Sequence, residues 1–182
     1  LTHSSYANEA TSKGENTKSN ERLEFLGDSV LSVIVSKFLF EEYPELPEGD
    51  LSKIRAQTVC EKTLARFARE ISLGEFLRLG HGESQNGGND RDSILADAFE
   101  ALLAAIYLDG GLDKVKEFLL PYAEGHIHGI LRRRNTTDYK TTLQQIVQQE
   151  NGEILDYITI SESGPAHKRV FEVEARINSN VI

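Results

Sequence analysis

Three carboxylates lie close together in the segment at residues 20–30, which reads Asn-Glu-Arg-Leu-Glu-Phe-Leu-Gly-Asp-Ser-Val. Glu21, Glu24 and Asp28 have the spacing i, i+3 and i+7, which places them within roughly 60° of one another on a helix. Bulky apolar residues occupy the opposite side of this helix: Leu23, Leu26, Val30 and Ile34. Core packing does not explain the acidic face, because like charges at these spacings repel. Carboxylates held this close usually need a cation.

A second segment, at residues 94–107, repeats the arrangement with Asp97 and Glu100 at i, i+3. Its bulky residues again lie on the other side: Phe99, Leu102, Leu103 and Ile106. The two helices can pack through their bulky faces, or they can bring their acidic faces together. The second arrangement would gather carboxylates into an oxygen-rich site suited to Mg²⁺ or Mn²⁺. Because acidic pairs also occur on solvated helix faces, the spacing predicts a candidate metal site and no named reaction.

The segment at residues 20–30 closely resembles the signature of the ribonuclease III family. Further matching segments occur in the family's order: Leu1-Thr-His-Ser-Ser-Tyr6, Glu48-Gly-Asp-Leu-Ser-Lys-Ile-Arg55, Leu79-Gly-His-Gly-Glu83 and Ile94-Leu-Ala-Asp-Ala-Phe-Glu-Ala101. The resemblance covers nearly the whole chain. It implies an endoribonuclease that hydrolyses double-stranded RNA with Mg²⁺, or with Mn²⁺ as a substitute. It also implies products with 5′-phosphate and 3′-hydroxyl ends and a role in rRNA and mRNA processing.

The resemblance also assigns roles to the acids. It implies that Glu24, Asp97 and Glu100 bind Mg²⁺, and that Glu100 is in addition catalytic. Asp28 would share the site and help to position the attacking water, and Glu21 would stand at the edge of the cleavage centre. Phosphodiester hydrolysis needs such a cluster, because a bound metal activates water and stabilises charge on the attacking and leaving oxygens.

Phe25 is an apolar residue on the acidic face, about 40° from Glu21 on the helix. An exposed Phe beside a metal site suggests that something outside the helix covers it. In the family, a Phe at this position inserts into the partner subunit. The resemblance therefore implies a homodimer whose interface includes Phe25, with two active centres, one for each RNA strand.

The apolar periodicity predicts a mainly α first domain. It favours helices at residues 21–43, 51–71, 94–108 and 113–131. The first of these stops before Pro44, and the pair Gly110-Gly111 ends the third. Polar and glycine-containing stretches predict loops at residues 8–20, 44–50 and 80–93. By the resemblance, residues 1–134 are expected to form an all-helical ribonuclease III endonuclease domain without the first family helix.

The tail, residues 135–182, changes character. A polar linker is expected at residues 132–138, then a helix at 139–149 and strands at 155–160 and 170–175. This order resembles an α/β double-stranded-RNA-binding domain, and the domain is expected to be incomplete because the final strand and basic last helix of the family are absent. By the resemblance, the RNA contacts would come from Thr141, Gln144, Gln145, Gln148, His167 and Lys168.

Bulk properties limit the class of protein. The formal net charge of the 182 residues is −9, whereas a typical nucleic-acid binder is basic. A metal would neutralise part of the acidic charge, and Arg132-Arg-Arg134 concentrates basic charge locally. No apolar run is long enough to span a membrane, so no membrane partner is expected. Cys60 has no partner for an internal disulfide, which suits a cytoplasmic location, and it is expected to be buried.

Two other functions remain open from the sequence. One is a catalytically silent module on the same scaffold that binds double-stranded RNA or forms dimers. The other is a different Mg²⁺-dependent phosphohydrolase. The presence of all five acids favours the endoribonuclease.

Overall fold

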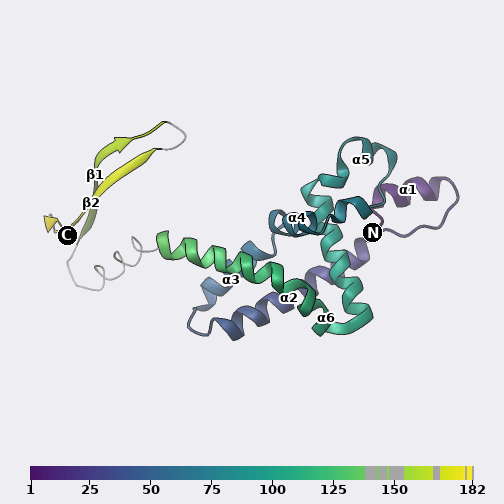
Figure 1. Ribbon diagram of the computed structural model, residues 1–182, viewed down its shortest axis with the longest axis horizontal. Helices are drawn as coiled ribbons and strands as arrows, with labels where there is room; N and C mark the ends of the chain where they lie inside the picture. The colour runs from purple at the N-terminus through teal and green to yellow at the C-terminus, as the bar shows by residue number, and fades with distance from the viewer. Residues whose placement is uncertain (138–142, 144–146, 148–153, 166–168, 179, 182) are drawn as a thin grey trace. The chain divides into compact units, whose positions relative to one another are not determined.

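A computed structural model describes the chain except for residues 138–142, 144–146, 148–153, 166–168, 179 and 182 (Figure 1). The chain divides into two compact units, Leu1–Gly129 and Ile130–Ile182. The helical elements, in order, are α1 (Ser4–Ser12), α2 (Glu21–Glu42), α3 (Glu48–Thr58), α4 (Glu61–Glu70), the 3₁₀ turn η1 (Leu73–Phe76), α5 (His81–Gln85), the 3₁₀ turn η2 (Gly88–Asp90) and α6 (Asp92–Thr137). The described helices include none that is both long and apolar enough to cross a membrane.

The core of the first unit contains four of the predicted apolar residues, Val30, Ile34, Phe99 and Leu103. The other four, Leu23, Leu26, Leu102 and Ile106, are only partly buried, and α2 turns further residues inward. Leu31, Val35 and Leu39 of α2 are fully buried, as are matching residues of α4 and α6. At the centre, the ring of Phe67 lies 5.9 Å from that of Phe99. Burying side chains of this size stabilises the unit by roughly 1.5–3 kcal/mol for each residue. The core therefore determines which faces of α2 and α6 are left outside it and can form a functional site.

The helix expected at residues 51–71 is in fact two helices, α3 and α4, and they meet at Val59 and Cys60. Cys60 has an extended backbone at the start of α4, and its side chain is exposed, so the expectation that it is buried is wrong. Its Sγ donates to the carbonyl oxygen of Gln57 at 3.3 Å. The periodicity did not reveal the break because both helices bury residues in the same core.

Two predicted loops contain short helices. The polar stretch at residues 8–20 begins inside α1, which buries only Ala7 and Ala10 and therefore gives little apolar signal. The stretch at residues 80–93 includes α5 and η2. It is tied to α4, because the Arg69 side chain donates to Asp90 at 2.6 Å and to Asp92 at 2.7 Å.

Helix α6 is interrupted at Gly111, where φ is 77° and ψ is −176°. This break confirms the helix end that Gly110-Gly111 predicts, because a positive φ favours glycine. The helix then resumes and continues to Thr137. The expected polar linker at residues 132–138 is therefore wrong for 132–137. The arginines in this stretch are good helix formers, so a polar composition alone did not mark a helix end.

The second unit contains an antiparallel sheet in the order β1-β2-β3, formed by Leu155–Ser163, Val170–Ile177 and Asn180–Val181. The two predicted strands are confirmed, and the pairing of β1 with β2 shifts register between Thr159 and Ser161. The short β3 pairs with β2, so the expectation of no further strand is wrong for these two residues. The helix predicted at 139–149 lies outside the described residues, except for Leu143 and Val147, which are helical.

Candidate metal centre

The two acidic segments meet where α2 passes close to α6 at Gly27. A Cβ atom placed on Gly27 would overlap the carbonyl group of Glu100 and lie 3.0 Å from its Cα atom. Only glycine permits this approach of one backbone to another. Of the two packing arrangements that the sequence left open, the structure therefore adopts the one that joins the acidic faces.

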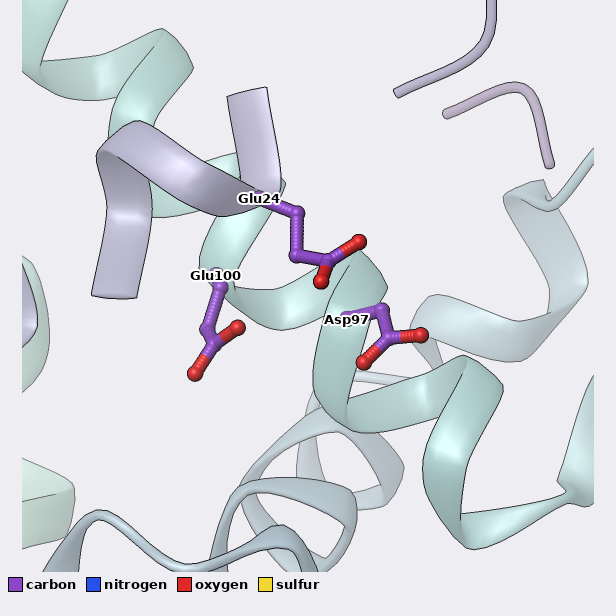
Figure 2. A group of neighbouring side chains, drawn as sticks. All are labelled: Glu24, Asp97 and Glu100. Atoms are coloured by element: carbon purple, nitrogen blue, oxygen red, sulfur yellow. The ribbon is translucent and has the colours of Figure 1, made fainter. Parts of the chain in front are cut away.

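Glu24 of α2 and Asp97 and Glu100 of α6 form the centre of the site. Each offers one carboxylate oxygen, and these three oxygens lie within 4.8 Å of one another. Figure 2 shows the three side chains converging from the two helices. All three are half-buried. The backbone contact at Gly27 thus places Glu24, one turn earlier on α2, opposite the two acids of α6.

Burial is the largest influence on all three carboxyl groups, and it raises the pKa of each. Burial and the neighbouring acids Asp28, Asp97 and Glu24 raise the pKa of Glu100 from 4.5 to about 8. The pKa of Glu24 is raised by burial and then by Asp97, Glu21 and Asp28. Without a cation, Glu100 therefore holds a proton at neutral pH.

Two further acids predicted for the site lie at its margin. Glu21 and Asp28 are exposed and are not part of the group within 4.8 Å. Their charges nevertheless reach the site, since Asp28 raises the pKa of Glu100 and both raise the pKa of Glu24. The Glu21 carboxylate accepts a hydrogen bond from the hydroxyl of Ser19 at 2.8 Å.

The chemistry of these donors fits Mg²⁺ or Mn²⁺. The three ligands are all carboxylates, and hard divalent cations of this kind prefer oxygen donors and keep several waters. A cation would also offset the burial and the neighbouring negative charges that together raise the pKa of Glu100. Glu24, Asp97 and Glu100 would therefore be the residues that hold a divalent metal at this centre.

Two residues near Asp97 were missed by the sequence reasoning. Burial raises the pKa of Asp97, and the charge of Glu61, the first residue of α4, raises it further, whereas His3 lowers it. Residues 3 and 61 have no spacing relation to residue 97. Apart from the resemblance of Leu1–Tyr6 to the family, no pattern in the sequence points to these two residues.

The outer face of α2 presents a second feature. Phe25 is 78% exposed and Phe40, on the same face near the other end of the helix, is 74% exposed. Between α2 and α3 lies a groove of about 540 Å³. Its lining comprises Ser36, Lys37, Leu39, Phe40, Glu48, Leu51, Ser52 and Arg55. In the described chain nothing covers either phenylalanine ring.

The residues predicted to contact RNA lie outside the described residues. They are Thr141, Gln144, Gln145, Gln148, His167 and Lys168.

Comparison with known proteins gives two family matches. Residues 1–123 match the family described as Ribonuclease-III-like, and residues 139–182 match the double-stranded RNA binding motif. A protein named Ribonuclease 3 from Caldanaerobacter subterraneus subsp. tengcongensis is 51% identical over all of this chain and 78% of its own length. Another of that name, from Pelotomaculum thermopropionicum, is also 51% identical, over 94% of this chain and 70% of its own.

Solved structures show the same similarity. The nuclease domain of a ribonuclease III from Campylobacter jejuni matches with a TM-score of 0.62 and 41% identity. The match covers 69% of this chain and 82% of that one. That structure is described as showing flexibility in a region involved in dimer formation.

Proposed function

This chain belongs to the ribonuclease III family, and we propose that it is an endoribonuclease that hydrolyses double-stranded RNA with Mg²⁺. The observation that carries the proposal is the convergence of Glu24, Asp97 and Glu100 within 4.8 Å. The match of residues 139–182 to a double-stranded RNA binding motif supports the choice of substrate. The relatives named Ribonuclease 3 support the choice of reaction.

In this proposal Glu24, Asp97 and Glu100 hold the metal. A metal bound there would supply an activated water and would stabilise negative charge on the phosphate oxygens. Glu100 gives up its proton when the metal binds, because a ligating carboxylate must be ionised. Asp28, exposed beside Glu100, accepts a hydrogen bond from the attacking water and orients it toward phosphorus. Attack by this water on phosphorus, with departure of the 3′ oxygen, leaves 5′-phosphate and 3′-hydroxyl ends. Glu21 borders the RNA at the edge of the centre.

The exposed face of α2 supports a homodimer. Phe25 and Phe40 are fifteen residues apart, or about 22 Å along the helix. In an antiparallel two-fold pairing of α2 with its copy, Phe25 of one subunit would enter the groove between α2 and α3 of the other. The two-fold axis would repeat this contact, so that each subunit inserts its Phe25 into the groove of the other. Each dimer would present two metal centres, one for each strand of the duplex.

The rest of the proposal concerns the tail and the setting. We assign residues 1–134 to the endonuclease domain and 135–182 to the RNA-binding domain. In the second domain, the proposed contacts to the RNA minor groove come from Thr141, Gln144, Gln145, Gln148, His167 and Lys168. The substrates are precursors of rRNA and mRNA in the cytoplasm.

The test is to incubate the protein with long double-stranded RNA in Mg²⁺ and in EDTA, with single-stranded RNA and double-stranded DNA as controls. Cleavage of the duplex RNA alone, only with metal, and with 5′-phosphate ends on the products, supports the proposal. Binding of the duplex without cleavage in Mg²⁺ or Mn²⁺ would instead identify a catalytically silent module. Release of phosphate from nucleotides with the duplex left intact would identify a different phosphohydrolase.

A further inference from the structure

Asn20 differs from the other buried polar residues of the described chain. It is 7% exposed, and the other two, Thr58 and Thr63, are 1% and 5% exposed. The Thr58 hydroxyl donates to the carbonyl of Ile54 at 2.8 Å. The Thr63 hydroxyl donates to the carbonyl of Gln57 at 2.9 Å. The carboxamide of Asn20 makes no hydrogen bond with any described residue. Because buried polar groups nearly always have a partner, we looked for one in the chemistry that surrounds Asn20.

The start of α2 does not account for the side chain of Asn20. An asparagine that caps a helix usually has an extended backbone, and its side-chain oxygen accepts from an N–H of the first turn. Asn20 instead has helical backbone angles, with φ −82° and ψ −2°, and its side chain makes no such bond. Capping therefore does not explain why a carboxamide is buried at this position.

The backbone holds the side chain of Asn20 beside that of Glu24. The carbonyl of Asn20 accepts from the N–H of Glu24 at 2.9 Å, which closes a helical turn between the two residues. Side chains four residues apart on such a turn lie on one face, with their Cβ atoms roughly 5–6 Å apart. The carbonyl of Thr2 accepts from the N–H of Asn20 at 2.8 Å and so ties this turn to the N-terminal segment. Asn20 is thus fixed one turn before the carboxylate that α2 contributes to the metal centre.

The polar ends of both side chains are available for a new contact. Among the described residues, the only fully enclosed side-chain polar atom without a hydrogen bond is Oε1 of Glu83. The small exposed part of Asn20 therefore includes its carboxamide. The Glu24 carboxylate is half-buried and accepts no hydrogen bond from a described residue. A donor without an acceptor and an acceptor without a donor thus lie on the same face of α2.

We infer that Asn20 is a positioning residue of the metal centre, and that its Nδ2 donates to a carboxylate oxygen of Glu24 when Glu24 binds a cation. The inference rests on the proposed function, because it takes Glu24 to be a metal ligand. A carboxylate that binds a metal is usually itself hydrogen-bonded, which fixes its direction. Loss of such a partner typically costs 10–100-fold in metal affinity.

The substitution Asn20→Leu separates this role from a structural one. Leucine keeps the size and the branching of the side chain but has no donor. If the carboxamide has no partner within the fold, its removal should not lower the stability of the metal-free protein. Thr58→Val is the matched control, because it also exchanges a buried polar side chain for an apolar one of the same shape. Thr58 lies in α3, outside the acidic cluster.

The two readouts are Mn²⁺ binding to the full chain without RNA, measured by calorimetry, and denaturant unfolding in EDTA. The inference predicts that Asn20→Leu weakens Mn²⁺ binding by about tenfold or more, whereas Thr58→Val stays within about threefold of wild type. It also predicts that Asn20→Leu is at least as stable as wild type in EDTA.

Unchanged Mn²⁺ binding by Asn20→Leu would overturn the inference. A loss of stability in EDTA would also overturn it, since the carboxamide would then have a structural partner in the fold. A wild type that binds no Mn²⁺, or that binds it only as well as Glu24→Gln does, would overturn the metal centre itself and this inference with it.

Discussion

Glu100 is the residue in which burial and charge act together most strongly. Its pKa of about 8 in the metal-free fold compares with an ordinary value of 4.5. Between these two pH values the folded chain holds a proton that the unfolded chain has released. Stability therefore falls as the pH rises from about 4.5 to about 8, because the native state binds more protons over this range.

This gives a prediction for the metal-free protein. Denaturant unfolding in EDTA should show lower stability at about pH 8 than at about pH 5. Glu100→Gln should lose less stability between these two pH values, because its amide does not titrate. Some pH dependence should remain in the variant, since the pKa values of Glu24 and Asp97 are also raised. The difference between the two proteins isolates Glu100. An identical pH dependence in wild type and variant would show that Glu100 does not titrate in this range.

The same proton governs metal affinity. Glu100 must release its proton to bind the metal. As the pH is raised toward about 8, Mn²⁺ affinity should therefore increase by about tenfold for each pH unit, and above about pH 8 it should level off. Calorimetry in buffers of different ionisation enthalpy should detect close to one proton released for each Mn²⁺ bound at neutral pH. Affinity that does not depend on pH would contradict the position of Glu100 among the ligands.

At the scale of elements, the site depends on the contact between α2 and α6. Gly27→Ala adds a methyl group where the backbone of Glu100 already lies, so the helices must separate. Overpacking of this kind typically costs about 1–3 kcal/mol of stability. It should also weaken Mn²⁺ binding, because Glu24 moves with α2.

Gly49→Ala in α3 is the matched control, because an added Cβ there meets no atom within 4 Å. It should leave metal binding unchanged and should not lower stability. Thermal unfolding and Mn²⁺ calorimetry of the two variants make the comparison. If both alanine variants bind Mn²⁺ as wild type does, the contact at Gly27 does not determine the geometry of the site.

The helices also show which features of the fold could be predicted from the sequence and which could not. The acidic and apolar faces of residues 21–43 and 94–108 predicted the helices and the candidate ligands. The sequence could not decide which faces meet, since both arrangements satisfy the same periodicity, and the decisive residue is Gly27. Helix α1 was missed because it buries only two alanines, and the break at Cys60 was missed because α3 and α4 share one core.

At the scale of the whole molecule, Phe25 tests the proposed dimer. The ring is 78% exposed in the single chain, so Phe25→Ala should leave the fold and its core intact. Burial in a partner would make the substitution cost roughly 3–5 kcal/mol at each of the two symmetric contacts. Sedimentation across a dilution series should then show the variant as a monomer where wild type is a dimer.

Phe76→Ala is the control, because Phe76 is also exposed but lies in η1, outside α2 and α3. The Phe76→Ala dimer should dissociate over the same range of protein concentration as the wild-type dimer. A Phe25→Ala dimer as tight as wild type, or a wild type that is monomeric at every concentration, would exclude this face of α2 as the interface.

The central claim is that the acidic cluster binds a metal with which the protein hydrolyses double-stranded RNA. The substitution Glu100→Gln tests this claim most directly. The change keeps the size of the side chain and removes a single ligand charge. The measurement is the single-turnover rate of cleavage of long duplex RNA in saturating Mg²⁺, with RNA binding and sedimentation measured on the same samples. We predict that cleavage is abolished while RNA binding and dimerisation persist. Cleavage by Glu100→Gln at a rate near that of wild type would contradict the account.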